Sequence, residues 1–94
     1  MESAGAAARS VLRVVVVSPE RQLFEGDATA VVAPAYDGEF GILPHHAPFL
    51  TLLGRGVVTV RQGAAEPKRF RVEGGFAQVA ANRVRIVVER AAAL

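Results

Sequence analysis

Two carboxylates and both histidines of this 94-residue chain lie within residues 37–51, Asp-Gly-Glu-Phe-Gly-Ile-Leu-Pro-His-His-Ala-Pro-Phe-Leu-Thr. A carboxylate beside an imidazole can act as a general acid or base, or bind zinc. Adjacent residues of an extended segment point to opposite sides, however, so His45 and His46 cannot easily bind one ion. The chain has no cysteine and no further histidine, and no lysine follows Gly38 and Gly41 as a phosphate-binding loop requires. We therefore expect no catalytic residue, no metal and no cofactor here.

Two other interpretations of residues 37–51 remain. In the first, the glycines form a turn, the prolines stiffen it, and a histidine bonds a backbone carbonyl near the core. This interpretation leaves Glu39 among apolar neighbours without an evident local partner. In the second, a proline-braced loop at a sheet edge presents Glu39 and apolar side chains to another protein, and the prolines lower the cost of ordering it. A loop that only linked two strands would be short and polar, so the apolar residues favour an interface.

Period-two alternation predicts the strands that position this stretch. Apolar residues face inward at every second position after residue 57, with polar residues opposite. The predicted inward residues are Val58, Val60, Phe70, Val72, Val84, Ile86 and Val88. Further strands are expected at 11–17, 22–25 and 28–33, with Pro34 ending the last one, and turns at 54–56, 62–67, 74–75 and 81–82. Short strands with tight turns indicate an all-β fold, a small antiparallel two-sheet sandwich or barrel.

Length and composition indicate a single soluble domain. The chain is too short for a second domain, and no apolar run approaches the ~18 residues of a membrane span. We expect a flexible tail at 1–10, a β-sandwich domain at 11–90 and a short tail at 91–94. The early acid and the lack of an apolar segment argue against a secretory signal.

The outward-facing arginines suggest an alternative function. A basic strip on a small β-barrel is typical of modules that bind single-stranded nucleic acid. The strip would contain Arg61, Arg69, Arg71, Arg83 and Arg85. Stacking aromatics are scarce, since the chain has one tyrosine and no tryptophan. A solvated face is therefore the favoured interpretation, and nucleic acid is not expected as a partner.

Residues 37–51 also resemble the signature of the epsilon subunit of F-type ATP synthases. Its usual form is Glu-Gly-Glu-(apolar)-Gly-(apolar)-x-Pro-Gly-His-Ala-Pro-(apolar)-(apolar)-Thr, and residues 16–26, 54–60 and 73–79 agree in order and spacing. The resemblance covers residues 12–88. It implies the N-terminal two-sheet β-sandwich of a non-catalytic rotor subunit in the central stalk. Such a subunit links gamma to the membrane c-ring and couples ion translocation to ATP synthesis. It would lie at the cytoplasmic face of the cell inner membrane, as a peripheral protein that meets the membrane only through the c-ring.

The resemblance also implies site residues. The c-ring interface would contain Glu39, Phe40, Gly41 and Ile42, and the gamma interface His46 and Thr51. His45 departs from the family pattern, because it replaces a glycine that can adopt a positive φ. The chain also ends at Leu94, so we expect it to lack the family's C-terminal helical hairpin and the regulatory activity of that hairpin.

Overall fold

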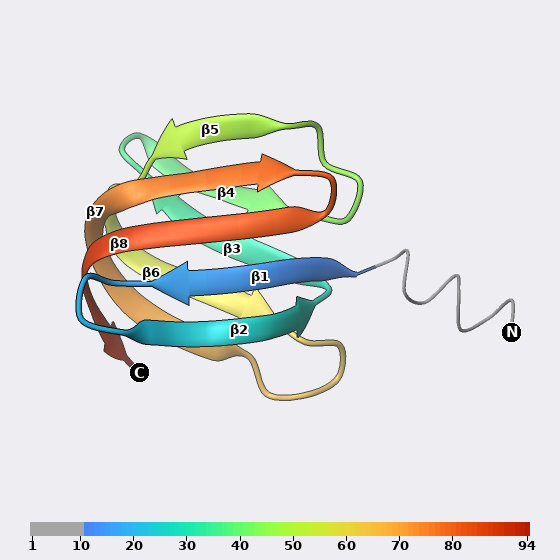
Figure 1. Ribbon diagram of the computed structural model, residues 1–94, viewed down its shortest axis with the longest axis horizontal. Helices are drawn as coiled ribbons and strands as arrows, with labels where there is room; N and C mark the ends of the chain where they lie inside the picture. Colours follow the sequence, from blue (N-terminus) through green and yellow to red (C-terminus); the bar gives the residue numbers. More distant parts are fainter. Residues whose placement is uncertain (1–10) are drawn as a thin grey trace, which may run out of the picture.

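The computed structural model describes residues 11–94, which form eight strands (Figure 1). The described residues contain no helix, so the all-β prediction is confirmed, and none of them forms a helix suited to crossing a membrane. The expected flexible tail at 1–10 lies outside the described residues. The strands are β1 (Leu12–Val17), β2 (Gln22–Ala28), β3 (Ala30–Ala35), β4 (Gly38–Ile42), β5 (Phe49–Leu52), β6 (Arg55–Arg61), β7 (Lys68–Ala80) and β8 (Arg83–Ala93).

The strands form one sheet that folds over on itself into two layers. Its order is β2-β1-β8-β7-β6-β3-β4, and β5 pairs with the second half of β7. The long strands β7 and β8 curve round one end of the molecule and belong to both layers (Figure 1). The front layer contains β2, β1, the start of β8, the end of β7 and β5; the back layer contains the end of β8, the start of β7, β6, β3 and β4. The predicted two-layer sandwich is therefore confirmed, with one difference: β1 pairs with β8 in parallel, whereas the other pairs are antiparallel.

Gly74 and Gly75 form the bend of β7, not the turn expected there. Both have positive φ, 75° and 115°, which favours glycine. The strand continues through them, since Glu73 pairs with Arg90 and Gly75 with Val88. A Cβ on Gly75 would overlap the carbonyl oxygen of Val87. The two glycines thus allow β7 and β8 to stay paired while they cross from one layer to the other.

Two predicted strand ends were also wrong. Pro34 lies inside β3. Because the pairing of β3 with β6 stops at Val32, the backbone N–H that proline lacks is not needed for a hydrogen bond to β6. The expected tail at 91–94 instead continues β8 to Ala93, where Ala93 pairs with Phe70. The strand extends because β7 offers it a paired neighbour beyond the bend.

The core lies between the two layers and is apolar. All seven side chains predicted to face inward are buried, and none of the buried residues among 11–94 is polar or charged. Leu12, Val14 and Val16 of β1 and Val31 of β3 are also fully buried. The alternation in the sequence therefore fixes which face of each strand is left for other contacts.

Candidate interaction site

Residues 37–51 connect the free edges of the two layers. The stretch includes all of β4, the edge strand of the back layer, and most of β5, which pairs only with β7 in the front layer. The expectation of a loop was therefore wrong at both ends, because Gly38–Ile42 pairs with β3 and Phe49–Leu52 with β7. Asp37, in the turn before β4, and residues 43–48 lie outside the strands.

Aromatic packing fixes the shape of this stretch. The rings of Phe40 and Phe49 meet edge to face, with centroids 5.5 Å apart and an interplanar angle of 82°. The His46 ring lies 4.9 Å from the Phe49 ring, and the His46 Nδ1–H donates to the carbonyl of Ala47 at 2.7 Å. Ile42 is fully buried in the core. The structural interpretation therefore accounts for these side chains, and the remaining exposed ones are presented on a well-braced segment.

A tight turn joins the two strands. The His46 N–H donates to the carbonyl of Leu43 at 3.2 Å, Pro44 occupies the second position and His45 the third, with φ 70°. Proline at the second position and positive φ at the third are features of a type II turn. The His45 N–H also donates to Oδ1 of Asn82 at 2.6 Å, which ties the turn to the β7–β8 hairpin. His45 therefore adopts the conformation that a glycine would adopt more easily.

Replacing His45 with glycine is expected to raise the free energy of unfolding by about 0.5 kcal/mol. The left-handed conformation costs a side-chain-bearing residue ~1–2 kcal/mol, and the extra chain entropy of glycine returns roughly half of that. Urea unfolding checks the prediction. His46→Gly is the control and should lower stability, because its ring packs on Phe49. A less stable His45→Gly variant would contradict the strain at this turn.

The residues expected at the c-ring interface divide into exposed and buried members. Glu39 and Gly41 are exposed, and no atom lies within 4 Å of where a Cβ on Gly41 would be. No cation lies within 4.0 Å of the Glu39 carboxylate among residues 11–94. Phe40 is half-buried. Ile42, which was also predicted at this interface, has a fully buried side chain that holds β4 to the core.

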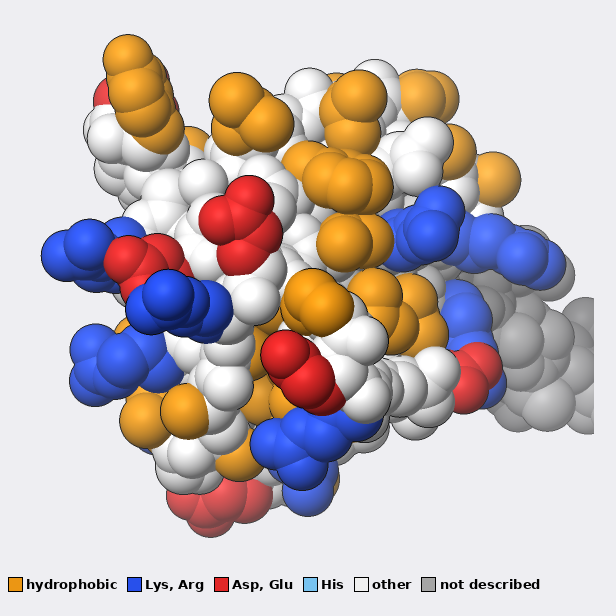
Figure 2. Space-filling view, turned by 60° about the vertical axis from the view of Figure 1, so that its left-hand side comes forward, with side chains coloured by type: hydrophobic (Ala, Val, Ile, Leu, Met, Phe, Trp, Pro, Cys, Tyr) orange, Lys and Arg blue, Asp and Glu red, His pale blue; other side chains and the backbone are white. Residues whose placement is uncertain are grey.

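The residues expected at the gamma interface lie near two exposed leucines of β5. His46 and Thr51 are half-buried, and the Thr51 hydroxyl donates to the Leu52 carbonyl at 3.3 Å. On either side of Thr51, Leu50 and Leu52 are 66% and 74% exposed. Leu52 pairs with the half-buried Phe76 of β7. Figure 2 shows hydrophobic side chains gathered over the upper part of the molecule, the part that carries β5.

The two leucines were missed in the sequence, although a signal for them exists. Residues 49–52 are Phe-Leu-Thr-Leu, so large apolar side chains occur on both faces of the strand. Only one face of an edge strand can pack on the core. A strand with apolar residues on both faces therefore indicates that something else covers its outer side.

The five outward arginines do not form one strip. Arg69 and Arg71 lie on the start of β7 in the back layer, whereas Arg83 and Arg85 lie on the start of β8 in the front layer. The bend at residues 74–75 separates the two pairs. Residues 11–94 also contain no group of three or more His, Cys, Asp or Glu side chains that could hold a metal ion.

Comparisons with known proteins agree with this fold. Residues 11–93 match the family model described as the β-sandwich domain of the ATP synthase delta/epsilon chain. An ATP synthase epsilon chain of Hyphomonas neptunium is 48% identical over 80 residues, which are 85% of this chain and 59% of that relative. The epsilon chain of Caulobacter vibrioides is 46% identical over 80 residues, 85% of this chain and 92% of the relative. The chain thus spans less than two thirds of the length of the first relative and most of the second.

Solved structures show the same fold at low identity. A chain in the Euglena gracilis mitochondrial ATP synthase structure of OSCP, F1 and c-ring has a TM-score of 0.82 at 21% identity, covering 89% of this chain and 54% of that chain. A chain in the central stalk and c-ring structure of the Tetrahymena thermophila mitochondrial enzyme has a TM-score of 0.73 at 19% identity, covering 86% of this chain and 65% of that one.

Proposed function

This chain belongs to the delta/epsilon family of ATP synthase chains, and on this premise we propose that it is a non-catalytic rotor subunit. It links the gamma subunit to the membrane c-ring in the central stalk, and so couples ion translocation to ATP synthesis. One observation carries the proposal: a braced segment joins the two free sheet edges and exposes the acid Glu39 on one and leucines on the other. Two separate exposed surfaces suit a subunit held between two partners.

The edge of β4 is the proposed c-ring surface. Glu39 and Gly41 are exposed, and Phe40 is half-buried between them. A carboxylate with no cation within 4.0 Å among residues 11–94 can bind polar loops of a partner. Because Gly41 has no Cβ, the partner can approach the backbone closely at this point. Ile42 supports this surface from inside the core.

The outer face of β5 is the proposed gamma surface. Leu50 and Leu52 lie next to the originally expected residues His46 and Thr51. Neighbouring exposed apolar side chains on a small domain mark a protein contact. The half-buried Phe76 beside Leu52 extends this surface onto β7. We propose that these residues hold the subunit to gamma.

The proposed location follows from the proposed partners. A subunit held between gamma and the c-ring would lie at the cytoplasmic face of the cell inner membrane and reach the membrane only through the c-ring. The catalytic nucleotide sites would belong to other subunits. Nucleic-acid binding gains no support, because the arginines of the suggested basic strip are divided between the two layers.

Replacing Glu39 with arginine is expected to weaken association with a gamma–c-ring complex by at least tenfold and to leave binding to gamma alone unchanged. The charge reversal acts on an exposed side chain, so the free energy of unfolding should change by less than about 0.5 kcal/mol. Co-elution with purified gamma and with the gamma–c-ring complex measures the two binding effects. Glu66→Arg is the matched control, since Glu66 is exposed in the loop between β6 and β7.

Each outcome has a separate meaning. If the unmodified chain binds neither gamma nor the complex, the proposed function is wrong. If Glu39→Arg unfolds the domain, Glu39 is a structural residue. If Glu39→Arg and Glu66→Arg weaken the complex equally, the effect comes from net charge and not from the β4 edge.

A further inference from the structure

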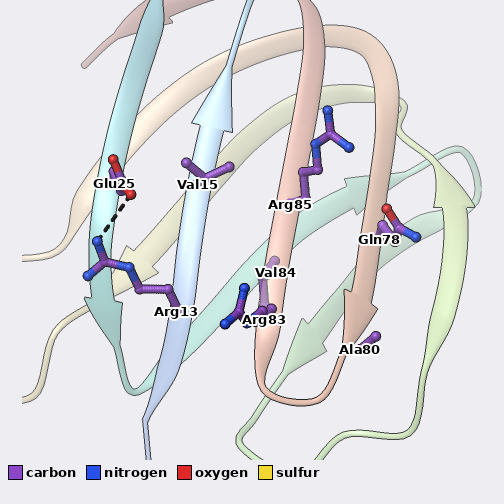
Figure 3. Close-up of a pocket in the computed structure, with 8 residues that line it drawn as sticks. All are labelled: Arg13, Val15, Glu25, Gln78, Ala80, Arg83, Val84 and Arg85. Carbon is purple, nitrogen blue, oxygen red and sulfur yellow. Dashed lines mark hydrogen bonds and ion pairs between the residues drawn. The ribbon is translucent and has the colours of Figure 1, made fainter.

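The front layer carries a shallow basin of about 590 Å³ on its outer face. It lies over β2, β1, β8 and β7, and Figure 3 shows three arginines along it. Strand pairing arranges its side chains in two rows. One row is Leu50, Gln78, Arg85, Val15 and Glu25; the other is Ala80, Arg83, Arg13 and Asp27. The basin is therefore continuous with the exposed leucines of β5.

Glu25 and Asp27, the acids on this face among the described residues, both bond the same arginine. Arg13 bonds Glu25 at 3.1 Å and Asp27 at 3.3 Å, and these two hydrogen bonds raise the pKa of Arg13. Arg83 and Arg85 have no carboxylate within 4.0 Å among residues 11–94. Both are exposed. Within residues 11–94, the two arginines at the start of β8 thus have no bonded counter-charge.

Arg83 has no acid of its own within the described domain. It lies directly opposite Arg13 in the parallel β1–β8 pair. Glu25 and Asp27 of β2 both bond Arg13 and form no ion pair with Arg83. Neither Arg83 nor Arg85 takes part in an ion pair among residues 11–94, so both guanidinium groups are available to a partner.

We infer that Arg83 and Arg85 bind the carboxylates of an acidic segment on the protein partner that covers β5. This inference rests on the proposed function. Guanidinium groups bind carboxylates in a bidentate, directional way. On a strand, residues at positions i and i+2 are separated by roughly 6.6 Å. On a helix, residues at positions i and i+4 are separated by about 6 Å along the axis. The surface therefore fits an amphipathic helix of gamma that places apolar side chains on Leu50 and Leu52 and an Asp or Glu pair, four residues apart, on the two arginines.

The charge pattern favours a narrow acidic segment over a broad anionic surface. Glu25 and Asp27 line the β2 side of the face, and β1 separates them from the arginines of β8. A flat anionic membrane would meet these acids as well as the arginines. A segment running along β8 meets Arg83 and Arg85 and avoids β2.

Replacing both arginines tests the inference. Arg83→Gln/Arg85→Gln is expected to weaken binding to purified gamma at least tenfold at low salt and to flatten the salt dependence of the dissociation constant. Arg69→Gln/Arg71→Gln is the matched control, since it removes two exposed arginines two residues apart from the back layer. The control should bind as the unmodified chain does.

The other results overturn the inference in distinguishable ways. If the unmodified chain does not bind gamma, the proposed function fails and the inference with it. If it binds gamma and both double variants bind equally well, the inference fails and the proposed function stands. If Arg83→Gln/Arg85→Gln loses binding to vesicles containing anionic phospholipid, or loses self-association, while gamma binding is unchanged, the occupant is a membrane or a second copy and not an acidic protein segment.

Discussion

Replacing Phe70 with alanine is expected to lower the free energy of unfolding by about 3–5 kcal/mol. Phe70 is 5% exposed and lies on β7 between Val58 of β6 and Ala93 of β8. Its ring centroid is 6.5 Å from that of Phe24 on β2, so the ring also connects the back layer to the front layer. Truncation removes the apolar area and leaves a cavity between the layers. Urea unfolding, followed by circular dichroism, measures the loss.

Neighbouring residues provide the control for Phe70. Arg69 and Arg71 flank it on the same strand and are exposed. Arg69→Ala and Arg71→Ala should each change stability by less than about 0.5 kcal/mol. A loss below about 1 kcal/mol for Phe70→Ala, or a loss as large for Arg71→Ala, would mean that this strand faces the opposite way.

The alternation of apolar and polar side chains was the sequence pattern that predicted the fold well. Residues 84, 86 and 88 are Val, Ile and Val with arginine at 83 and 85, and only one strand face can pack on a core. The structure buries all three and exposes both arginines. Alternation is a local property, so it can be read without knowing which strands are neighbours.

Strand partners could not be predicted in the same way. The parallel pairing of β1 with β8 joins segments about 70 residues apart, and nothing in either segment specifies the other. The Gly74-Gly75 pair was interpreted as a turn because a turn and a strand bend both use glycine at positive φ. Only the continued pairing of Gly75 with Val88 distinguishes the two.

The predicted site residues differ in exposure in a way that the sequence did not indicate. Glu39 was expected on an exposed edge, and it is exposed. Ile42 and Leu50 have similar chemistry, yet one is fully buried and the other is 66% exposed. Their difference depends on which face of its strand each residue occupies, since Ile42 faces the core and Leu50 faces outward. Because residues 49–52 carry apolar side chains on both faces, alternation alone does not say which face of that strand packs on the core.

Replacing Gly75 with alanine is expected to destabilise the domain by more than about 3 kcal/mol. Two costs combine at this position. A φ of 115° is strained for any side-chain-bearing residue, at roughly 1–3 kcal/mol. The added methyl would also overlap the Val87 carbonyl and lie 2.8 Å from the Cα of Val88, and these backbone atoms cannot rotate away. Thermal unfolding of the variant beside the unmodified chain measures the sum.

Two other glycines separate the two costs. Gly63 has φ 64° with no atom within 4 Å of an added Cβ, so Gly63→Ala carries only backbone strain, about 1 kcal/mol. Gly41 has neither positive φ nor a close neighbour, so Gly41→Ala should leave stability within about 0.5 kcal/mol. If Gly75→Ala costs no more than Gly63→Ala, the bend of β7 shifts to accept a methyl group. The paired β7 and β8 would then not hold the two layers in one fixed arrangement, whereas the row of Leu50, Gln78 and Arg85 lies wholly in the front layer and would keep its pairing.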